Sequence, residues 1–262
     1  MSADITMLDL HLRRRALIGY AVGLGLYALV IAALYPSFKN DTSLNNFTKN
    51  GSAAAALFGA NGPITTPTGW LNVNLYANFV PLVALLLTIG YGASCLAGQD
   101  EDGTLGLLAS LPVARRRLVI QKLATLSLQA IAVSIVTALC AIAGRGFDLT
   151  VSTRGLIGVT VGVILLGIDF GALAMCIGAA TGSRGSALGV TSALAAASYL
   201  ISSLAPAVHW LHPARYASPF FYAVGDGQLD HGLHTASAAV LAGAAAALLL
   251  AAITAFDRLD VH

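Results

Sequence analysis

Charged residues are scarce in this chain. They make up only 10% of its 262 residues, whereas 57% are hydrophobic and the mean hydropathy is +0.78. Soluble domains usually carry about 25% charged residues, and a soluble fold of this length would leave most of the apolar side chains without an interior to fill. Several charge-free runs reach about 20 residues, the length that crosses a bilayer core about 30 Å thick. The sequence therefore predicts a polytopic membrane protein.

Other features are absent, and each absence excludes a class of protein. Fourteen Lys and Arg against twelve Asp and Glu give a net charge of +2, so no basic field exists to bind nucleic acid by counterion release. Glu101 is the sole glutamate and has no His-Glu-x-x-His context, and neither a Gly-x-Ser-x-Gly motif nor a Gly-Lys dipeptide occurs. We therefore expect no enzyme, with no catalytic residue, metal or nucleotide held by this chain itself.

The apolar runs predict six membrane spans. Each must be helical, because lipid offers no partner for an open backbone and the runs lack the alternation of a barrel. The expected spans cover residues 16–35, 73–98, 118–144, 156–180, 187–208 and 235–256, each bound approximate. No internal repeat or linker marks a second domain. The fold class predicted is an all-α, single transmembrane domain over residues 1–262.

The distribution of Lys and Arg predicts that both termini are cytoplasmic. With the N-terminus inside, nine of these residues lie on the inner side and five on the outer side, as the positive-inside rule requires. Two arginine triplets account for most of the difference. We expect them to anchor at anionic lipid headgroups of the cell membrane; they are Arg13, Arg14, Arg15, Arg115, Arg116 and Arg117.

The N-terminal stretch 4–15 precedes the first span and is amphipathic. Ile5, Leu8 and Leu12 recur at helical spacing, opposite Asp4, Asp9 and the first arginine triplet. This pattern predicts a short helix lying on the inner leaflet; a disordered tail is the alternative.

Two longer connections are expected on the outer face. Pro36–Asn72 is rich in Asn, Thr, Gly and Pro, which predicts an irregular loop. His209–His234 is semi-apolar and carries aromatic residues of the kind that favour the membrane interface, so we expect a broken or re-entrant helix there. Its two histidine pairs, His209/His212 and His231/His234, fit interfacial polar residues better than a zinc site, since no cysteine accompanies them.

The most informative polar stretch follows the second span. Residues 98–117 read GQDEDGTLGLLASLPVARRR. The acidic cluster suits the positive end of a helix dipole, with Asp102 as N-cap, and Pro112 ends the helix. Leu105, Leu108 and Leu111 then line one face. The pattern predicts a short amphipathic helix on the inner side; an interfacial staple between two spans is the alternative.

This stretch resembles the signature of ABC-2 type transporter permeases, roughly EEExGTLELLLSxPVSRRR. The similarity extends to Thr66–Asn72, to Gly182–Gly185, and to Ala205-Pro206 with Tyr216–Phe220. Two positions depart from the pattern, because Gln99 and Gly106 stand where the family usually has Glu.

The resemblance implies a permease subunit of an ABC exporter. The segment after the second span would be a coupling helix that docks into a separate ATP-binding subunit. Two such ATPase subunits, which hold the ATP and Mg²⁺, and a second permease copy or a homologue would complete the unit. The coupling residues would be Gln99, Asp100, Glu101, Asp102, Gly103, Thr104, Leu105, Leu108, Leu111 and Pro112. The charge-poor spans favour a hydrophobic or amphipathic cargo such as a drug, an antibiotic or a lipid.

Asp169 is the one acidic residue in the middle of a predicted span. An ionisable group at that depth costs about 3 kcal/mol or more and marks a functional site by default. It could lie on a substrate path or bind a proton, which gives the alternative function of a proton-coupled secondary transporter; a neutral Asp hydrogen-bonded between helices is the other reading. The glycine pairs Gly158/Gly162 and Gly167/Gly171 in the same span predict close helix packing, within the chain or between two copies.

Overall fold

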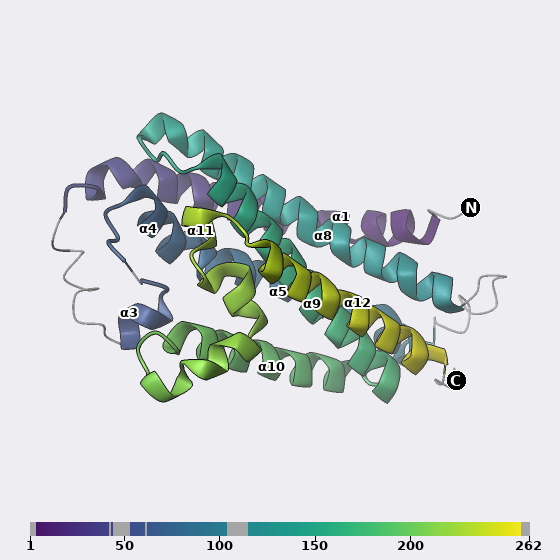
Figure 1. Ribbon diagram of the computed structural model, residues 1–262. Coiled ribbons are helices and arrows are strands. Elements are labelled where there is room, and N and C mark those ends of the chain that lie inside the picture. Colours follow the sequence, from purple (N-terminus) through teal and green to yellow (C-terminus); the bar gives the residue numbers. More distant parts are fainter. Residues whose placement is uncertain (1–3, 42, 44–52, 61, 104–114, 258–262) are drawn as a thin grey trace.

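The computed structural model describes residues 4–41, 43, 53–60, 62–103 and 115–257. Its elements are all helical, and no strand occurs among the described residues. They form one elongated bundle in which the first turns of α1 and the last turns of α12 lie at the same end (Figure 1). We call this the N-terminal end of the bundle. The far end carries the short helices α3, α4 and α11 (Figure 1).

Six helices of the described chain are long and apolar enough to cross a membrane, as predicted. Their candidate spans are Thr6–Phe38, Pro67–Glu101, Arg116–Phe147, Thr153–Thr181, Arg184–Leu204 and Thr235–Phe256. The long helices are α1 (Asp4–Phe38), α5 (Phe79–Ala93), α8 (Arg115–Ala143), α9 (Thr153–Thr181), α10 (Arg184–Leu204) and α12 (Thr235–Asp257). The short ones are α3 (Ala53–Leu57), α4 (Pro67–Leu71), η1 (Asn72–Tyr76), η2 (Ser94–Gly98), α6 (Gln99–Glu101), η3 (Gly144–Phe147), η4 (His209–Leu211), η5 (Pro213–Ala217), η6 (Phe221–Gly225) and α11 (Gln228–His231). The all-α, polytopic fold class is therefore confirmed.

The N-terminal stretch differs from its prediction. It is helical, but it is continuous with the first span, so α1 runs unbroken for 35 residues. Leu8 and Leu12 are 53% and 71% exposed, whereas Asp9 is buried against other helices. The expectation that Asp9 shares a solvent-facing side with the arginines is wrong, because the residue has buried partners on two other helices.

The connection between the first two spans is more regular than predicted. Thr66 caps α4 by accepting a hydrogen bond from the Gly69 amide, and Pro67 occupies the first turn, a position that suits its fixed φ. Trp70 donates a hydrogen bond of 2.9 Å to the carbonyl of Ile31 and stacks on Phe38. Part of the expected loop is therefore helical and is fastened to α1.

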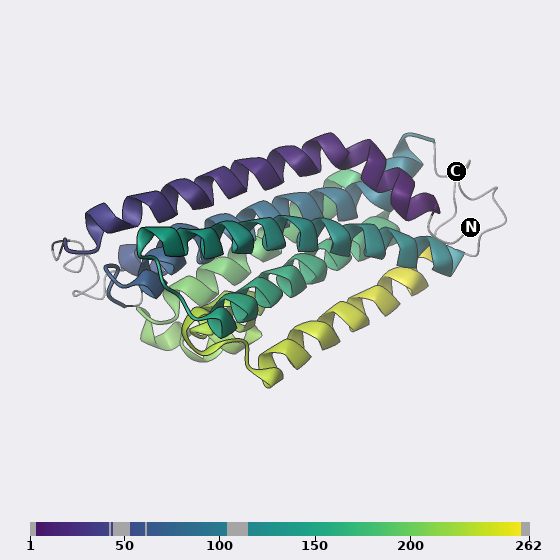
Figure 2. The same cartoon turned by 90° about the horizontal axis from the view of Figure 1, so that it is seen from above.

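Helix α9 is the centre of the bundle. It contacts α5, α8, α10, α11 and α12, and 67% of its most apolar window is buried, against 22% for α10 and 17% for α12. Helices α1 and α12 lie at opposite edges in Figure 2, with α8 and α9 between them. The two least buried helices, α10 and α12, thus leave most of their apolar surface to lipid or to another protein.

Glycines let neighbouring backbones approach α9 closely. A Cβ on Gly158 would lie 2.3 Å from the amide nitrogen of Leu233, and one on Gly162 would lie 2.2 Å from the carbonyl oxygen of Ala223. A Cβ on Gly171 would lie 2.4 Å from the side chain of Leu126. These glycines pack within the chain, which was one of the two predicted alternatives.

The segment 209–234 is a broken helix, as predicted. It consists of η4, η5, η6 and α11, and α11 is bounded by Gly227 and Gly232, whose φ values of +68° and +84° favour glycine. Ser218 ties the segment to α10 through a 2.8 Å hydrogen bond between its hydroxyl and the Ser198 carbonyl. Its η6 turn contacts α9 at the height of Gly162.

Replacing Gly162 should destabilise this packing. In Gly162→Ala the new methyl group meets backbone, which cannot move aside cheaply, so we expect a loss of about 1–3 kcal/mol and a fall in the midpoint of thermal unfolding by several degrees. Gly243→Ala is the control, because nothing lies within 4 Å of its Cβ position. Equal midpoints for the two variants in detergent would contradict the close packing.

Candidate functional site

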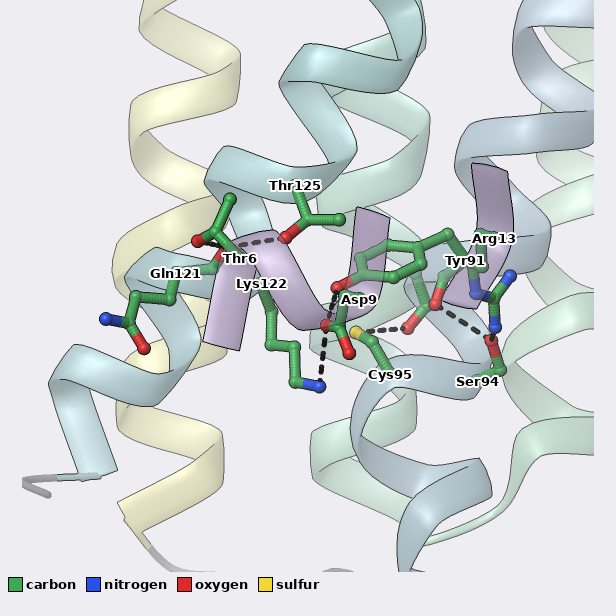
Figure 3. Close-up of polar contacts among 10 residues, drawn as sticks. Thr6, Asp9, Arg13, Tyr91, Ser94, Cys95, Gln121, Lys122 and Thr125 are labelled. Atoms are coloured by element: carbon green, nitrogen blue, oxygen red, sulfur yellow. Dashed lines mark hydrogen bonds and ion pairs between the residues drawn. The ribbon is translucent and has the colours of Figure 1, made fainter. Parts of the chain in front are cut away.

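Three helices meet in a buried polar cluster at the N-terminal end of the bundle. Asp9 comes from α1, Tyr91 from α5 and Lys122 from α8, and Figure 3 shows the carboxylate between its two partners. The Lys122 ammonium lies 2.8 Å from Asp9 Oδ2, and the Tyr91 hydroxyl donates a 2.5 Å hydrogen bond to the same oxygen. The side chain of Lys122 is 1% exposed and that of Asp9 is 10% exposed.

The burial of this ion pair determines its energetics. Removing two charges from water costs several kcal/mol per ion, and only close pairing with further hydrogen bonds offsets that cost. Tyr91 supplies such a bond to Asp9. The pair as a whole therefore adds little to the free energy of unfolding. Loss of one charge, however, would leave the other buried without a counter-ion and would destabilise the fold.

Two further contacts extend the cluster. Thr6 and Thr125 both donate hydrogen bonds to the Gln121 carbonyl, at 3.2 and 3.1 Å. Arg13 donates a 2.8 Å hydrogen bond to Ser94 Oγ (Figure 3). The Thr6 bond fastens α1 to α8, the Thr125 bond lies within α8, and the Arg13 bond fastens α1 to η2.

The Arg13 guanidinium also lies over the Tyr91 ring, 4.9 Å from its centroid. A cation in this position is attracted by the electron-rich ring face. Tyr91 is therefore held on two sides, by Asp9 at its hydroxyl and by Arg13 at its ring.

The acidic segment after η2 is tied to the start of α10. Glu101 Oε1 accepts a 2.9 Å hydrogen bond from the backbone amide of Arg184, the first residue of that helix. A carboxylate at a helix N-terminus is stabilised by the dipole and satisfies an otherwise unpaired amide. Ser183 caps the same helix through its hydroxyl.

The cluster lies between the two flanks of the segment 104–114. Tyr91 and Glu101 precede that segment, and Lys122 follows it on α8. Asp9 therefore joins both flanks through one carboxylate oxygen. Residues 104–114 themselves lie outside the described residues.

The chain matches the family model described as ABC-2 family transporter protein over residues 4–261. The chain belongs to the ABC-2 transporter family. Among curated proteins, none is similar enough to give a match. The protein is thus a multi-pass membrane protein and an ABC transporter permease, and its family associates with an ABC ATPase subunit.

The structure describes about half of the coupling residues predicted for the permease. Gln99, Asp100 and Glu101 form α6, with Asp102 and Gly103 in the turn that follows. Gly103 has a φ of +66°, a conformation that glycine adopts without strain. The remaining predicted residues, Thr104, Leu105, Leu108, Leu111 and Pro112, lie outside the described part of the chain.

The arginines predicted to anchor at headgroups take two different environments. Arg14, Arg15, Arg116 and Arg117 are exposed at the N-terminal end, where each stays a prediction as an anchor; the side chain of Arg115 is not described. Arg13 is also exposed but contacts Ser94 and Tyr91. It therefore belongs to the cluster as well as to the surface.

Asp169 is buried in the middle of α9. Within the described part of the permease, neither of its carboxylate oxygens has a hydrogen-bond partner. The structure does not bring it to the cluster, since Asp9 and Lys122 lie at the end of the bundle. The expected hydrogen bond between helices is not among the contacts of the described residues.

Sequence reasoning missed the partnership at the centre of this site. The sequence pattern assigns Lys122 only to the nine inner-side charges and Asp9 to a polar helix face. The available signal was a lone lysine one turn inside the apolar run of the third span, which requires an acid nearby. Which acid it is cannot be read from spacing, because the partners are 113 residues apart.

Removing one charge of the pair should be far worse than removing both. Lys122→Met leaves Asp9 as a buried carboxylate without its counter-ion, so we expect a loss of about 3–5 kcal/mol and a clear fall in the thermal unfolding midpoint. The double variant Asp9→Asn/Lys122→Met should recover much of that loss.

The matched control is the exposed pair of Lys39 and Asp148, also at 2.8 Å. Asp148→Asn should change the midpoint little, because exposed pairs contribute little. A Lys122→Met variant as stable as Asp148→Asn would show that the cluster is not a buried charged pair in the membrane.

Proposed function

We propose that the permease is the membrane-spanning subunit of an ATP-driven exporter that carries a hydrophobic or amphipathic compound, such as a drug, an antibiotic or a lipid, out of the cell. The observation that carries this proposal is the acidic segment 99–103, which leads into the signature-like stretch 104–114. Glu101 ties this segment to α10, and the segment lies along the chain between Tyr91 and Lys122, the two partners of Asp9. If a soluble partner displaces this segment, the displacement can be transmitted to α1, α5 and α8, the three helices that meet in the buried cluster.

ATP would be hydrolysed by a separate subunit. The chain contains no Gly-Lys dipeptide, so it has no P-loop to cradle the phosphates. Two ATPase subunits with their ATP and Mg²⁺, and two permease copies or a permease and a homologue, would form the working unit.

The expected cargo follows from the charges inside the bundle. Among the described residues, the buried charged side chains are Asp9, Lys122 and Asp169, and the first two neutralise each other. A sugar phosphate or an ion would find few groups to replace its hydration. An apolar or amphipathic molecule needs none.

The proposed orientation places the N-terminal end in the cytoplasm of a plasma-membrane protein. This end carries Arg13–Arg15, Arg116, Arg117, Lys122 and Arg184, and the positive-inside rule puts such a surplus in the cytoplasm. Only this orientation presents segment 104–114 to a cytoplasmic ATPase.

An arginine on the proposed coupling face should uncouple the complex. Leu108→Arg would bury an unpaired charge in the groove of the partner, so we expect loss of ATPase-subunit co-purification and of cargo-stimulated ATP hydrolysis. The control is Leu8→Arg, at an exposed site on α1, where a long Arg side chain can reach the headgroups. Unchanged recruitment by Leu108→Arg would reject the coupling role and favour the interfacial staple.

The unpartnered carboxyl group of Asp169 favours a second candidate function, a proton-coupled secondary transporter. If Asp169 carries a proton during transport, Asp169→Asn should abolish transport while leaving folding and assembly intact. If it only packs, the amide can replace the acid, and transport should persist across pH. Transport assays in reconstituted vesicles with and without ATP separate the two functions. An ATP-driven exporter needs ATP whatever the role of Asp169, whereas a proton-coupled transporter does not.

A further inference from the structure

An apolar groove lies between α5 and α10. It has a volume of about 360 Å³ and is lined by Leu82, Leu86 and Gly90 on α5 and by Leu188, Ser192 and Ala196 on α10. Leu82 and Leu86 are more than half exposed. A Cβ on Gly90 would meet nothing within 4 Å, so the groove floor is open there.

A second, polar hollow lies nearer the N-terminal end, and its lining shares no residue with that of the groove. It has a volume of about 330 Å³ and includes Arg13, Tyr91, Ser94 and Arg184 in its lining. Ser94 lies one helical turn beyond Gly90 and donates a 2.8 Å hydrogen bond to its carbonyl. Residues four apart share a helix face, so the two hollows follow the same face of this helix.

The α10 side shows the same continuity. Arg184 in the polar hollow and Leu188 in the apolar groove are also four residues apart. The two hollows therefore form one seam between α5 and α10, apolar along most of its length and cationic at the N-terminal end. We call it the α5–α10 seam.

Two arginines give the polar hollow its charge. Arg13 uses one nitrogen to bind Ser94 and has further N–H groups to offer, since a guanidinium carries five. The Arg184 backbone amide binds Glu101, but no hydrogen bond to its guanidinium occurs within the described chain. Both side chains are exposed, and both can reach a ligand.

Acidic groups at the hollow leave room for an anion. Asp9 is engaged by Lys122 and Tyr91, and Glu101 by the α10 amide. Asp102 is exposed at the rim. Among the residues that line the hollow, two guanidinium groups are therefore accompanied by one exposed carboxylate, that of Asp102. Planar guanidinium donors match the oxygens of a phosphate.

We propose that the α5–α10 seam binds one phospholipid, with its phosphate between Arg13 and Arg184 and an acyl chain along the apolar groove. A phospholipid matches the seam at both ends, since its apolar chain meets leucines and its anionic group meets arginines. The proposal does not rest on the coupling function proposed above, although Gln99 and Asp102 also line the polar hollow.

A second copy of the chain fits the seam less well. A two-fold axis along the membrane normal would bring the same surface of both copies together. The arginines of the partner would then lie at the same depth as Arg13 and Arg184, and like charges across an interface are unfavourable.

The test measures retention of phosphatidylglycerol by the purified full-length protein, with native mass spectrometry and a titration of added lipid. Arg13→Gln and Arg184→Gln should each weaken binding about tenfold or more, as expected for loss of a charged hydrogen bond. Gly90→Phe should block binding by filling the groove, and the open space at Gly90 lets the variant fold.

Two controls separate a built site from general attraction. Arg14→Gln removes a neighbouring charge outside the hollow, and Gly243→Phe adds the same ring to α12, where nothing lies within 4 Å of the Cβ position. Both should retain the lipid, and diacylglycerol, which lacks the phosphate, should bind poorly.

Three results would overturn the proposal. The first is an equal loss of lipid in Arg14→Gln, which indicates headgroup attraction only. The second is binding of diacylglycerol as tight as that of phosphatidylglycerol. The third is a Gly90→Phe variant that keeps its lipid but changes its oligomeric state, which assigns the groove to a second copy.

Discussion

The hydrocarbon core of a membrane offers no hydrogen-bond partner, and this constraint shapes the permease from its backbone to its charged groups. The spans are helices because a helix satisfies its own backbone. Several hydroxyl groups inside the spans follow the same rule, since Thr88, Thr137 and Thr160 each donate to the carbonyl four residues earlier. These polar side chains therefore obtain a hydrogen-bond acceptor within their own helix and do not need one from a neighbouring helix.

A charged group cannot be satisfied in that local way, so it determines which helices must meet. Lys122 lies just inside the third span and needs an anion, and the anion comes from α1. Tyr91 adds a donor from α5 to the same carboxylate oxygen. The pairing therefore fixes the positions of α1, α5 and α8 relative to one another at the end of the bundle where the two flanks of segment 104–114 lie. A displacement of either flank of that segment acts on the same carboxylate.

Features of the fold that depend on residues close together in the sequence could be predicted, whereas contacts between distant residues could not. Apolar runs predict six spans whose bounds lie within a few residues of the candidate spans, except at the starts of the first two, because run length and helix rise are linked. The start of α1 was not predicted correctly. An amphipathic helix usually buries its leucines and exposes its acids, but here Leu8 and Leu12 are exposed and Asp9 is buried in the protein. Helix α4 could have been found from Thr66-Pro67, a cap followed by a first-turn proline. The Asp9–Lys122 pair joins residues 113 apart, and no pattern along the chain selects Asp9 over other acids.

The two ends of the permease are held together by different means. At the far end the backbone of the broken helix 209–234 lies directly on α9, where Gly155, Gly158 and Gly162 leave no room for a Cβ. Close-packed backbone has few alternative arrangements, since any shift opens voids or produces clashes. At the N-terminal end, an apolar core that includes Leu96, Leu126 and Phe256 is joined by the buried ion pair of Asp9 and Lys122. Because separating Asp9 from Lys122 would leave two buried charges unpaired, α1 and α8 can rearrange at the N-terminal end only as a unit, packed on α9, which spans both ends and contacts α5, α8, α10 and α12.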